Sequence, residues 1–211
     1  MKRDDIGTRQ TRMKATEFTV REENNTPTIE GYFAVFNSNY DIAPGMSESI
    51  AQGAFSEALG GDIRALVNHD TTLVLGRNTN STLELREDSH GLWGQVRINP
   101  NDSEAMNLYE RVKRGDVDGC SIGFDIAEEK TEFLDNGDVH WTIEKVLPLY
   151  EVSAVTFPAY QDTNVSARTM QKEEIEKRKN EAWKEQMKAR VKNGTQSTDE
   201  TQGTDRPEQE A

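Results

Sequence analysis

The segment CSIGFDI, residues 120–126, decides the fold class. Side chains on a β-strand point alternately to its two faces, which places Ser121 and Gly123 on one face and Cys120, Ile122 and Phe124 on the other. The apolar face is predicted to lie in the core. The other face presents a hydroxyl beside a glycine, where another backbone has room to approach. The alternation therefore makes Ser121 a candidate nucleophile.

Short segments of the same β type surround this one. The turn formers Asp135-Asn136-Gly137 predict a hairpin. Further strands are predicted over residues 16–20, 28–36, 63–68, 73–75, 83–86, 92–98, 140–146 and 149–155. Helices are predicted over residues 53–59 and from Ser103 to about Lys113, the second with capping residues before it. This pattern predicts a mainly β or α+β domain, an antiparallel barrel or sandwich with attached helices.

The composition divides the chain into four parts. Residues 1–15 are polar and are predicted to be a flexible N-terminus, and residues 16–164 hold the predicted strands of one folded domain. Residues 165–192 are predicted to form a polar helix with few apolar positions. Residues 193–211 lack the apolar side chains that could offset the entropy of ordering them, so a disordered tail is predicted.

The charge of −13 excludes some classes of partner. Residues 1–164 hold 15 Lys and Arg against 28 Asp and Glu, whereas residues 165–211 hold 10 of each, so the folded part is acidic. An acidic surface repels phosphate, and no nucleic acid is expected as a partner, although solubility is the simplest reading of the charge. With one cysteine, no signal peptide and no apolar span, we expect a soluble protein of a reducing compartment without membrane contact.

A serine nucleophile needs a base, and the base needs an orienting group. His69 follows the apolar strand Ala65-Leu66-Val67 and could be that base, although an ordinary loop histidine fits the same position. Glu151 interrupts an apolar strand, where a carboxylate without a partner would be costly. That partner is predicted to be either an imidazole or a surface Lys or Arg.

Two other kinds of site have little support. Residues 119–123 match Gly-X-Ser-X-Gly, but the residues that follow are predicted to be strand, which argues against the nucleophile elbow of α/β-hydrolases. The three histidines lie far apart, without a His-Glu-X-X-His string or a thiolate pair. We therefore expect no metal and no cofactor.

Five strings in one order resemble the prohead proteases of tailed phages. The order and spacing match across residues 15–168, with these strings: EGYFAVFN (30–37), VNHD (67–70), LGR (75–77), SIGF (121–124), and EVS with PA (151–153 and 158–159). The resemblance implies a herpesvirus-protease-like antiparallel β-barrel with surrounding helices, followed by the polar helix and the tail. It also implies a serine endopeptidase that matures the viral capsid.

The resemblance carries roles to individual residues. It implies His69 and Ser121 as base and nucleophile, and Glu151 as the third member, where herpesvirus relatives use a second histidine. The other histidines, His90 and His140, fall in no matching string, but either could still be that third member. Arg77 and Gly123 are expected near the oxyanion or the substrate.

The resemblance further implies partners and a location. The expected substrates are the major capsid protein precursor, the scaffold and the chain itself, inside the immature capsid in the host cytoplasm. Related viral proteases dimerise, so a homodimer is one expected arrangement. The alternative from another class is a non-catalytic assembly or scaffolding protein of the capsid, and a third reading is a cellular β-barrel binding module.

Overall fold

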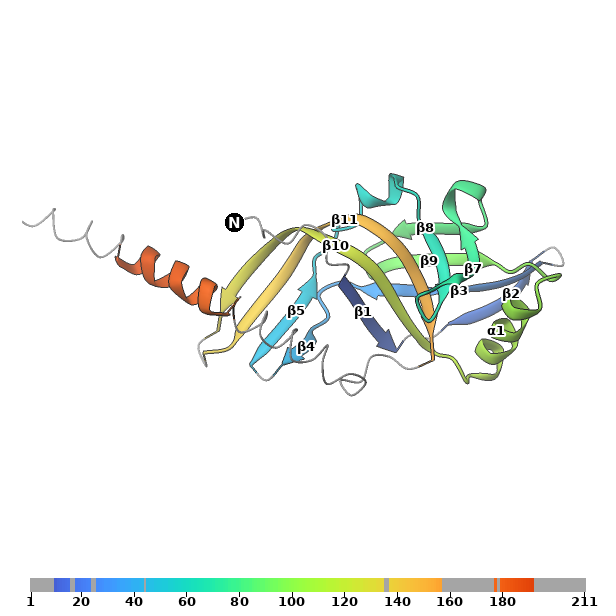
Figure 1. Ribbon diagram of the computed structural model, residues 1–211, viewed down its shortest axis with the longest axis horizontal. Helices are drawn as coiled ribbons and strands as arrows, with labels where there is room; N and C mark the ends of the chain where they lie inside the picture. Colours follow the sequence, from blue (N-terminus) through green and yellow to red (C-terminus); the bar gives the residue numbers. More distant parts are fainter. Residues whose placement is uncertain are drawn as a thin grey trace, which may run out of the picture. The chain divides into compact units, whose positions relative to one another are not determined.

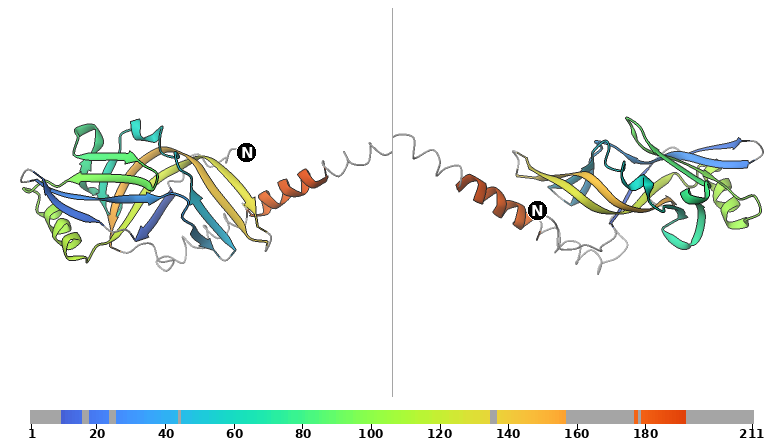
Figure 2. Two further views of the ribbon diagram at one scale, coloured as in Figure 1. Left: turned by 180° about the vertical axis from the view of Figure 1, so that it is seen from behind. Right: turned by 90° about the horizontal axis from the view of Figure 1, so that it is seen from above.

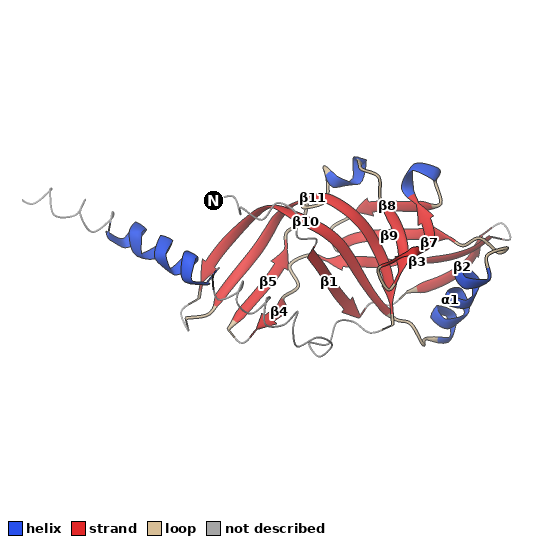
Figure 3. Cartoon of the chain, viewed as in Figure 1, coloured by secondary structure: helices blue, strands red, loops and turns tan. Residues whose placement is uncertain are grey.

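A computed structural model of the chain describes residues 10–15, 18–23, 26–43, 45–134, 137–156, 177 and 179–191. The chain divides into two compact units, Met1–Gln161 and Asp162–Ala211. Strands dominate the first unit (Figure 3). The described part of the second unit is helical and lies within the range predicted for the polar helix. None of the described helices is long and apolar enough to cross a bilayer.

Two sheets are formed by the described strands. The larger has the order β1-β10-β11-β5-β4, with β6 also paired to β11 and β7 paired to β6; the smaller has the order β2-β3-β9-β8. Their bounds are β1 Gln10–Ala15, β2 Thr19–Glu23, β3 Thr26–Val35, β4 Tyr40–Ala43, β5 Met46–Ile50, β6 Arg64–Val67, β7 Asp70–Arg77, β8 Leu83–Glu87, β9 Gly91–Arg97, β10 Gly119–Phe133 and β11 Val139–Val155. The mainly β prediction is therefore confirmed.

One long hairpin organises the larger sheet. Strands β10 and β11 pair antiparallel from Gly119↔Val155 to Phe133↔Val139, with register shifts between Gly123 and Glu129. The hairpin arches across Figure 1, and both views of Figure 2 show the same curvature. The turn formers at 135–137 predicted this hairpin, but residues 140–155, predicted as two strands, form one continuous strand.

The sheets differ from an antiparallel barrel in two respects. Strand β11 pairs in parallel with both β5 and β6, at opposite ends of its length. Parallel pairing needs a crossover connection, which local turn signals do not reveal, and this is why the sequence predicted antiparallel neighbours. The pairings among the described strands also do not return from one edge of a sheet to the other, so they form no closed barrel.

The core lies between the sheets and under the helix. The predicted core face of β10 is confirmed, since Cys120, Ile122 and Phe124 are each at most 1% exposed. They share one apolar cluster with side chains of the smaller sheet, such as Phe33 and Leu92. Burial of large apolar side chains of this kind contributes about 1.5–3 kcal/mol each. The strand that carries Ser121 is thus fixed by the core on its opposite face.

Helix α1, Ser103–Arg114, forms where the sequence predicted it. The carboxylate of Asp102 accepts hydrogen bonds from the backbone N–H groups of Glu104 and Ala105, which satisfies two donors of the first turn. Gly115 ends the helix with φ of 84°, a left-handed conformation that glycine adopts without strain.

The other predicted helix, residues 53–59, is wrong in extent. The segment forms turns, followed by a 3₁₀ turn at Ala58–Gly60. Its backbone groups are engaged elsewhere: the N–H of Phe55 donates to Glu87, and the carbonyl of Ala54 accepts from the N–H of Val146. The carbonyl of Ala54 therefore accepts a tertiary hydrogen bond in place of the helical bond, from residue 58, that local propensity favoured.

Candidate active site

A tight turn between β6 and β7 places His69. Val67 pairs with Asp70, and the two residues between them, Asn68 and His69, have φ of 50° and 62°. Positive φ at both central residues is the pattern of a type I′ hairpin turn. Positive φ is uncommon for residues other than glycine, although asparagine and histidine adopt it more often than most, and backbone held in such a conformation is often found at functional sites.

The turn is fastened to the end of β11. The backbone N–H of Asn68 donates to the carbonyl of Ala154 at 2.9 Å. The Asn68 side chain pairs with Thr156: its oxygen accepts from the Thr156 N–H at 2.9 Å, and its amide nitrogen donates to the Thr156 hydroxyl at 3.3 Å. These contacts hold the imidazole of His69 over the strand that carries Glu151.

His69 and Glu151 are in direct contact. Their closest atoms, Nδ1 and Oε1, lie 2.6 Å apart, and the Glu151 side chain is 2% exposed. Of the two partners expected for Glu151, an imidazole is therefore found in contact with it among the described residues. The hydroxyl of Ser153 donates to the other carboxylate oxygen, Oε2, at 2.6 Å and accepts from the backbone N–H of His69 at 3.2 Å.

Ser121 lies on the same face of the sheet as these groups. The register pairs Ser121 with Ser153 and Gly123 with Glu151, and directly opposite residues of an antiparallel pair project to one face. Ser121 is 0% exposed. Within the described residues, neither the Ser121 hydroxyl nor Nε2 of His69 has a hydrogen-bond partner, which is unusual for buried polar atoms.

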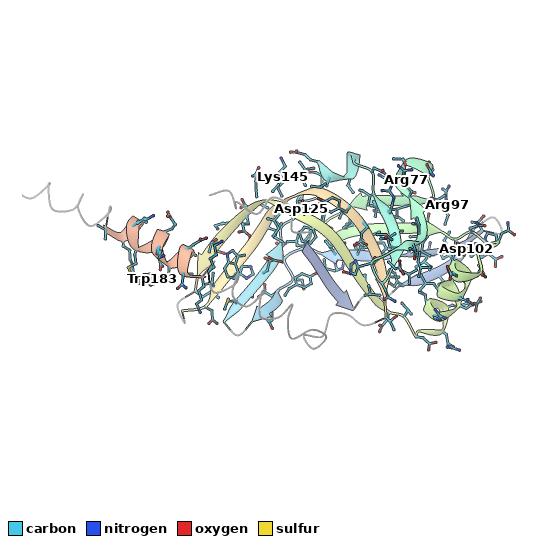
Figure 4. All side chains as sticks on the ribbon, in the orientation of Figure 1. Arg77, Arg97, Asp102, Asp125, Lys145 and Trp183 are labelled. Carbon is cyan, nitrogen blue, oxygen red and sulfur yellow. The ribbon has the colours of Figure 1, made fainter. Side chains whose placement is uncertain are left out.

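Arg77 lies at the periphery of this arrangement. Its guanidinium forms two hydrogen bonds to Asp62, at 2.6 and 2.7 Å, and Figure 4 shows it on the outer side of the sheet. These bonds hold the pKa of Asp62 below its ordinary value. The register runs from Glu151 through Arg64 to Arg77, two strands away. Gly123, in contrast, lies directly opposite Glu151.

A cavity of about 300 Å³ borders the carboxylate. It is lined by apolar, polar and charged side chains: Asp62, Arg64, Leu66, Thr71, Val74, Tyr150 and Glu151.

Asp70, the residue after His69, accepts hydrogen bonds from the hydroxyl and the backbone N–H of Thr72, which hold the pKa of that carboxyl below its ordinary value.

The other two histidines have different neighbours. Both ring nitrogens of His140 are in hydrogen-bond contact at 2.8 Å with hydroxyls on β5, Nδ1 with Ser47 and Nε2 with Ser49. The ring of His90 packs edge-on against Tyr32, with centroids 4.5 Å apart. Within the described residues, the group that contacts Nδ1 of His69 is Glu151 and not a second histidine.

Sequence reasoning missed Ser153 and Asn68. Ser153 follows Glu151 by two residues on a strand, so alternation alone would have placed its hydroxyl beside the carboxylate. Asn68 occupies the first central position of the hairpin, a position for which asparagine is favoured. Both signals are present in the sequence, but each has a meaning only once β6, β7 and β11 are known to be neighbours.

Comparisons with known proteins agree with the resemblance. A family model described as caudovirus prohead serine protease matches residues 13–179. The prohead protease of Enterobacteria phage HK97 is 31% identical over 159 residues, which cover 72% of this chain. The matched region spans 64% of the length of that relative.

A solved structure, the capsid assembly protease of bacteriophage T4, is a more distant likeness. It has a TM-score of 0.42 and 11% identity, and the match covers 69% of this chain and 98% of that one. The family model, by contrast, extends over most of the chain, including the β6–β7 turn and strands β10 and β11. This chain belongs to the family of caudovirus prohead serine proteases.

Proposed function

We propose that this chain is a serine endopeptidase that processes the capsid precursor during prohead maturation. Family membership supports the reaction class. The main support for the catalytic site is the contact at 2.6 Å between His69 and the buried carboxylate of Glu151. Ser121 supplies the nucleophile from the same face of the sheet. The substrates are the major capsid protein precursor, the scaffold and the chain itself, inside the immature capsid in the host cell.

The reaction follows from the roles of three side chains. Ser121 Oγ attacks the scissile carbonyl while His69 Nε2 takes its proton, and Glu151 stabilises the imidazolium that forms. Collapse of the tetrahedral intermediate breaks the C–N bond, and the leaving amine takes the proton from Nε2. Water then attacks the acyl-enzyme with the same base, releasing the acid and restoring Ser121.

Substrate must reach buried atoms. Because Ser121 is 0% exposed, the chain around it has to open before a peptide carbonyl can approach. Gly123, which has no side chain and lies two residues along β10 on the same face, leaves room for the substrate backbone. An oxyanion donor contributes roughly 3–4 kcal/mol to the transition state. We keep Arg77 as a candidate for that region, in which case it has to exchange its bonds to Asp62.

Two finer points belong to the same proposal. The first is that the fold is a variant of the herpesvirus maturation protease fold, in which the described strand pairs leave the barrel open. The second is that the protease acts as a homodimer. Sedimentation of the full chain tests the second, since a monomer at all concentrations contradicts it.

The test is cleavage of the capsid precursor by the full chain. Ser121→Ala should abolish cleavage and leave the melting temperature close to that of the unsubstituted chain, because a strand tolerates the loss of one hydroxyl. Cys120→Ala is the matched control: it changes the neighbouring residue, on the core face, and should retain cleavage. Cleavage that persists in Ser121→Ala would contradict Ser121 as the nucleophile, and absence of cleavage by the unsubstituted chain would favour the alternative, in which the chain assists capsid assembly without catalysis.

A further inference from the structure

We propose that Ser153 is a positioning residue that determines which ring nitrogen of His69 carries the proton. The inference rests on the proposed role of His69 as the base. Among the described residues, the Ser153 side chain joins the backbone of His69 to the carboxylate of Glu151 through two hydrogen bonds. It lies on β11 and is 0% exposed.

The direction of the hydrogen bonds follows from one fixed donor. The backbone N–H of His69 can only donate, so the Ser153 oxygen accepts there at 3.2 Å. The Ser153 proton is then directed to Oε2 of Glu151, 2.6 Å away, which makes that oxygen an acceptor. With Oε2 held by Ser153, the ionised carboxylate presents Oε1 to the ring, and because Oε1 accepts there, its contact with Nδ1 requires a proton on Nδ1.

This polarity leaves Nε2 with a free lone pair. In neutral imidazole one nitrogen donates and the other accepts, so a proton on Nδ1 makes Nε2 the base. Nε2 is buried and has no hydrogen-bond partner among the described residues. A single chain of hydrogen bonds, from backbone N–H through Ser153 and Glu151 to Nδ1, thus prepares the nitrogen that has to receive the proton of Ser121.

The same polarity distinguishes the two serines that face each other. Ser121 and Ser153 are directly opposite on β10 and β11. The proton of Ser153 is committed to Glu151, whereas the hydroxyl of Ser121 is unpartnered within the described residues. Ser153 is therefore not a competing nucleophile.

Loss of the Ser153 hydroxyl should disturb both ends of the chain of hydrogen bonds. At 0% exposure, water does not replace it without rearrangement, so the His69 N–H loses its acceptor and Glu151 loses a donor. The left-handed backbone conformation of His69 is then held by fewer hydrogen bonds. A displacement of about 1 Å at a reacting group can cost about 100-fold in rate, which sets the expected loss for Ser153→Ala.

The experiment measures kinetics and tautomer together. The full chain carrying Ser153→Ala should cleave capsid precursor with kcat reduced about 10- to 100-fold and KM little changed, because orientation of the base matters only along the reaction. Ser153→Thr restores the hydroxyl and should recover part of that loss. The control is Ser49→Ala, which removes a buried hydroxyl that also contacts a histidine, His140, and should leave kcat unchanged.

The tautomer is read from the imidazole ¹⁵N shifts of His69. These are recorded in a Ser121→Ala background, which prevents self-cleavage, at a pH where the ring is neutral. The Nδ1-protonated form should dominate, and adding Ser153→Ala should produce a mixture. A ring protonated on Nε2 while Ser153 is intact overturns the proposal without requiring that Ser153→Ala folds. An unchanged kcat in a folded Ser153→Ala enzyme overturns it as well.

The outcomes separate this inference from the proposed function. If His69→Ala and Ser121→Ala both abolish cleavage while Ser153→Ala matches Ser49→Ala, the positioning role fails and the catalytic assignment stands. If His69→Ala and Ser121→Ala leave cleavage intact, the proposed function fails, whatever Ser153 does.

Discussion

Replacement of Glu151 by glutamine tests the third member of the site most severely. The carboxylate has a donor at each oxygen: His69 Nδ1 lies 2.6 Å from Oε1, and the Ser153 hydroxyl lies 2.6 Å from Oε2. Glutamine has nearly the same shape but only one oxygen, so one of the two donors would face an NH₂ group. Because the Glu151 side chain is 2% exposed, water can do little to replace the lost hydrogen bond.

The magnitude follows from the two ways in which the variant can rearrange. If the amide NH₂ faces Nδ1, the ring has to accept there, and Nε2 then carries the proton and cannot act as a base. If the amide oxygen faces Nδ1, the tautomer survives but the charge that stabilises the imidazolium is lost. In a Ser-His-Asp triad the corresponding change costs about 10⁴ in turnover, or about 5.4 kcal/mol of activation free energy.

Single-turnover cleavage of capsid precursor is the appropriate assay. Glu151→Gln should lose about 10³- to 10⁴-fold in rate with little change in substrate binding, since the charge develops only during the reaction. His90→Ala and His140→Ala are controls, because their rings contact Tyr32, Ser47 and Ser49 instead. A near-normal Glu151→Gln enzyme beside a crippled histidine variant would refute the assignment in favour of a Ser-His-His arrangement.

Three further predictions concern the supports of the site and the ends of the chain. Asn68→Ala should lower the free energy of unfolding by about 2 kcal/mol, because alanine is strained at φ of 50° and the hydrogen bonds to Thr156 are lost. Asn68→Gly loses the same hydrogen bonds without the strain and should cost about half as much. Chemical denaturation measures both losses, and equal losses would contradict the turn assignment. The hydrogen bond from the Tyr32 hydroxyl lowers the pKa of Asp88 from 3.8, so its stabilisation is present above that value and is lost as pH falls below it; Tyr32→Phe should flatten the acid limb of the stability curve, and an unchanged limb would contradict this. Deletion of residues 193–211 should leave the melting temperature nearly unchanged, and a large decrease would show that this segment packs against the domain.

Local sequence patterns predicted most individual strands and helices well, but apart from the β10–β11 hairpin they did not predict which strands pair with one another. Alternation at 120–126 identified the core face of β10, and the capping residue Asp102 located α1, because both depend on residues close in sequence. The contact between His69 and Glu151 spans 82 residues and depends on the parallel pairing of β6 with β11. No local pattern encodes that pairing, and the resemblance to a family supplied the link instead.

One segment and two residues illustrate the same limit. The segment 53–59 has helix-forming side chains, but its backbone is engaged by Glu87 and Val146, which are distant in sequence. Ser153 was given no role of its own, because that role depends on a backbone N–H from another element. Arg77 was placed near the oxyanion by resemblance alone, and its bonds to Asp62 became visible only with the β6–β7 hairpin.

Covalent labelling of the full chain with a fluorophosphonate, located by mass spectrometry, tests the central claim most directly. The reagent reacts with a serine whose proton an adjacent base removes, and it does not depend on knowledge of the cleavage sequence. We expect one adduct, on Ser121, that is absent in Ser121→Ala and forms much more slowly in His69→Ala and Glu151→Gln. An adduct on another serine, or labelling of Ser121 that is unaffected by His69→Ala, would contradict it.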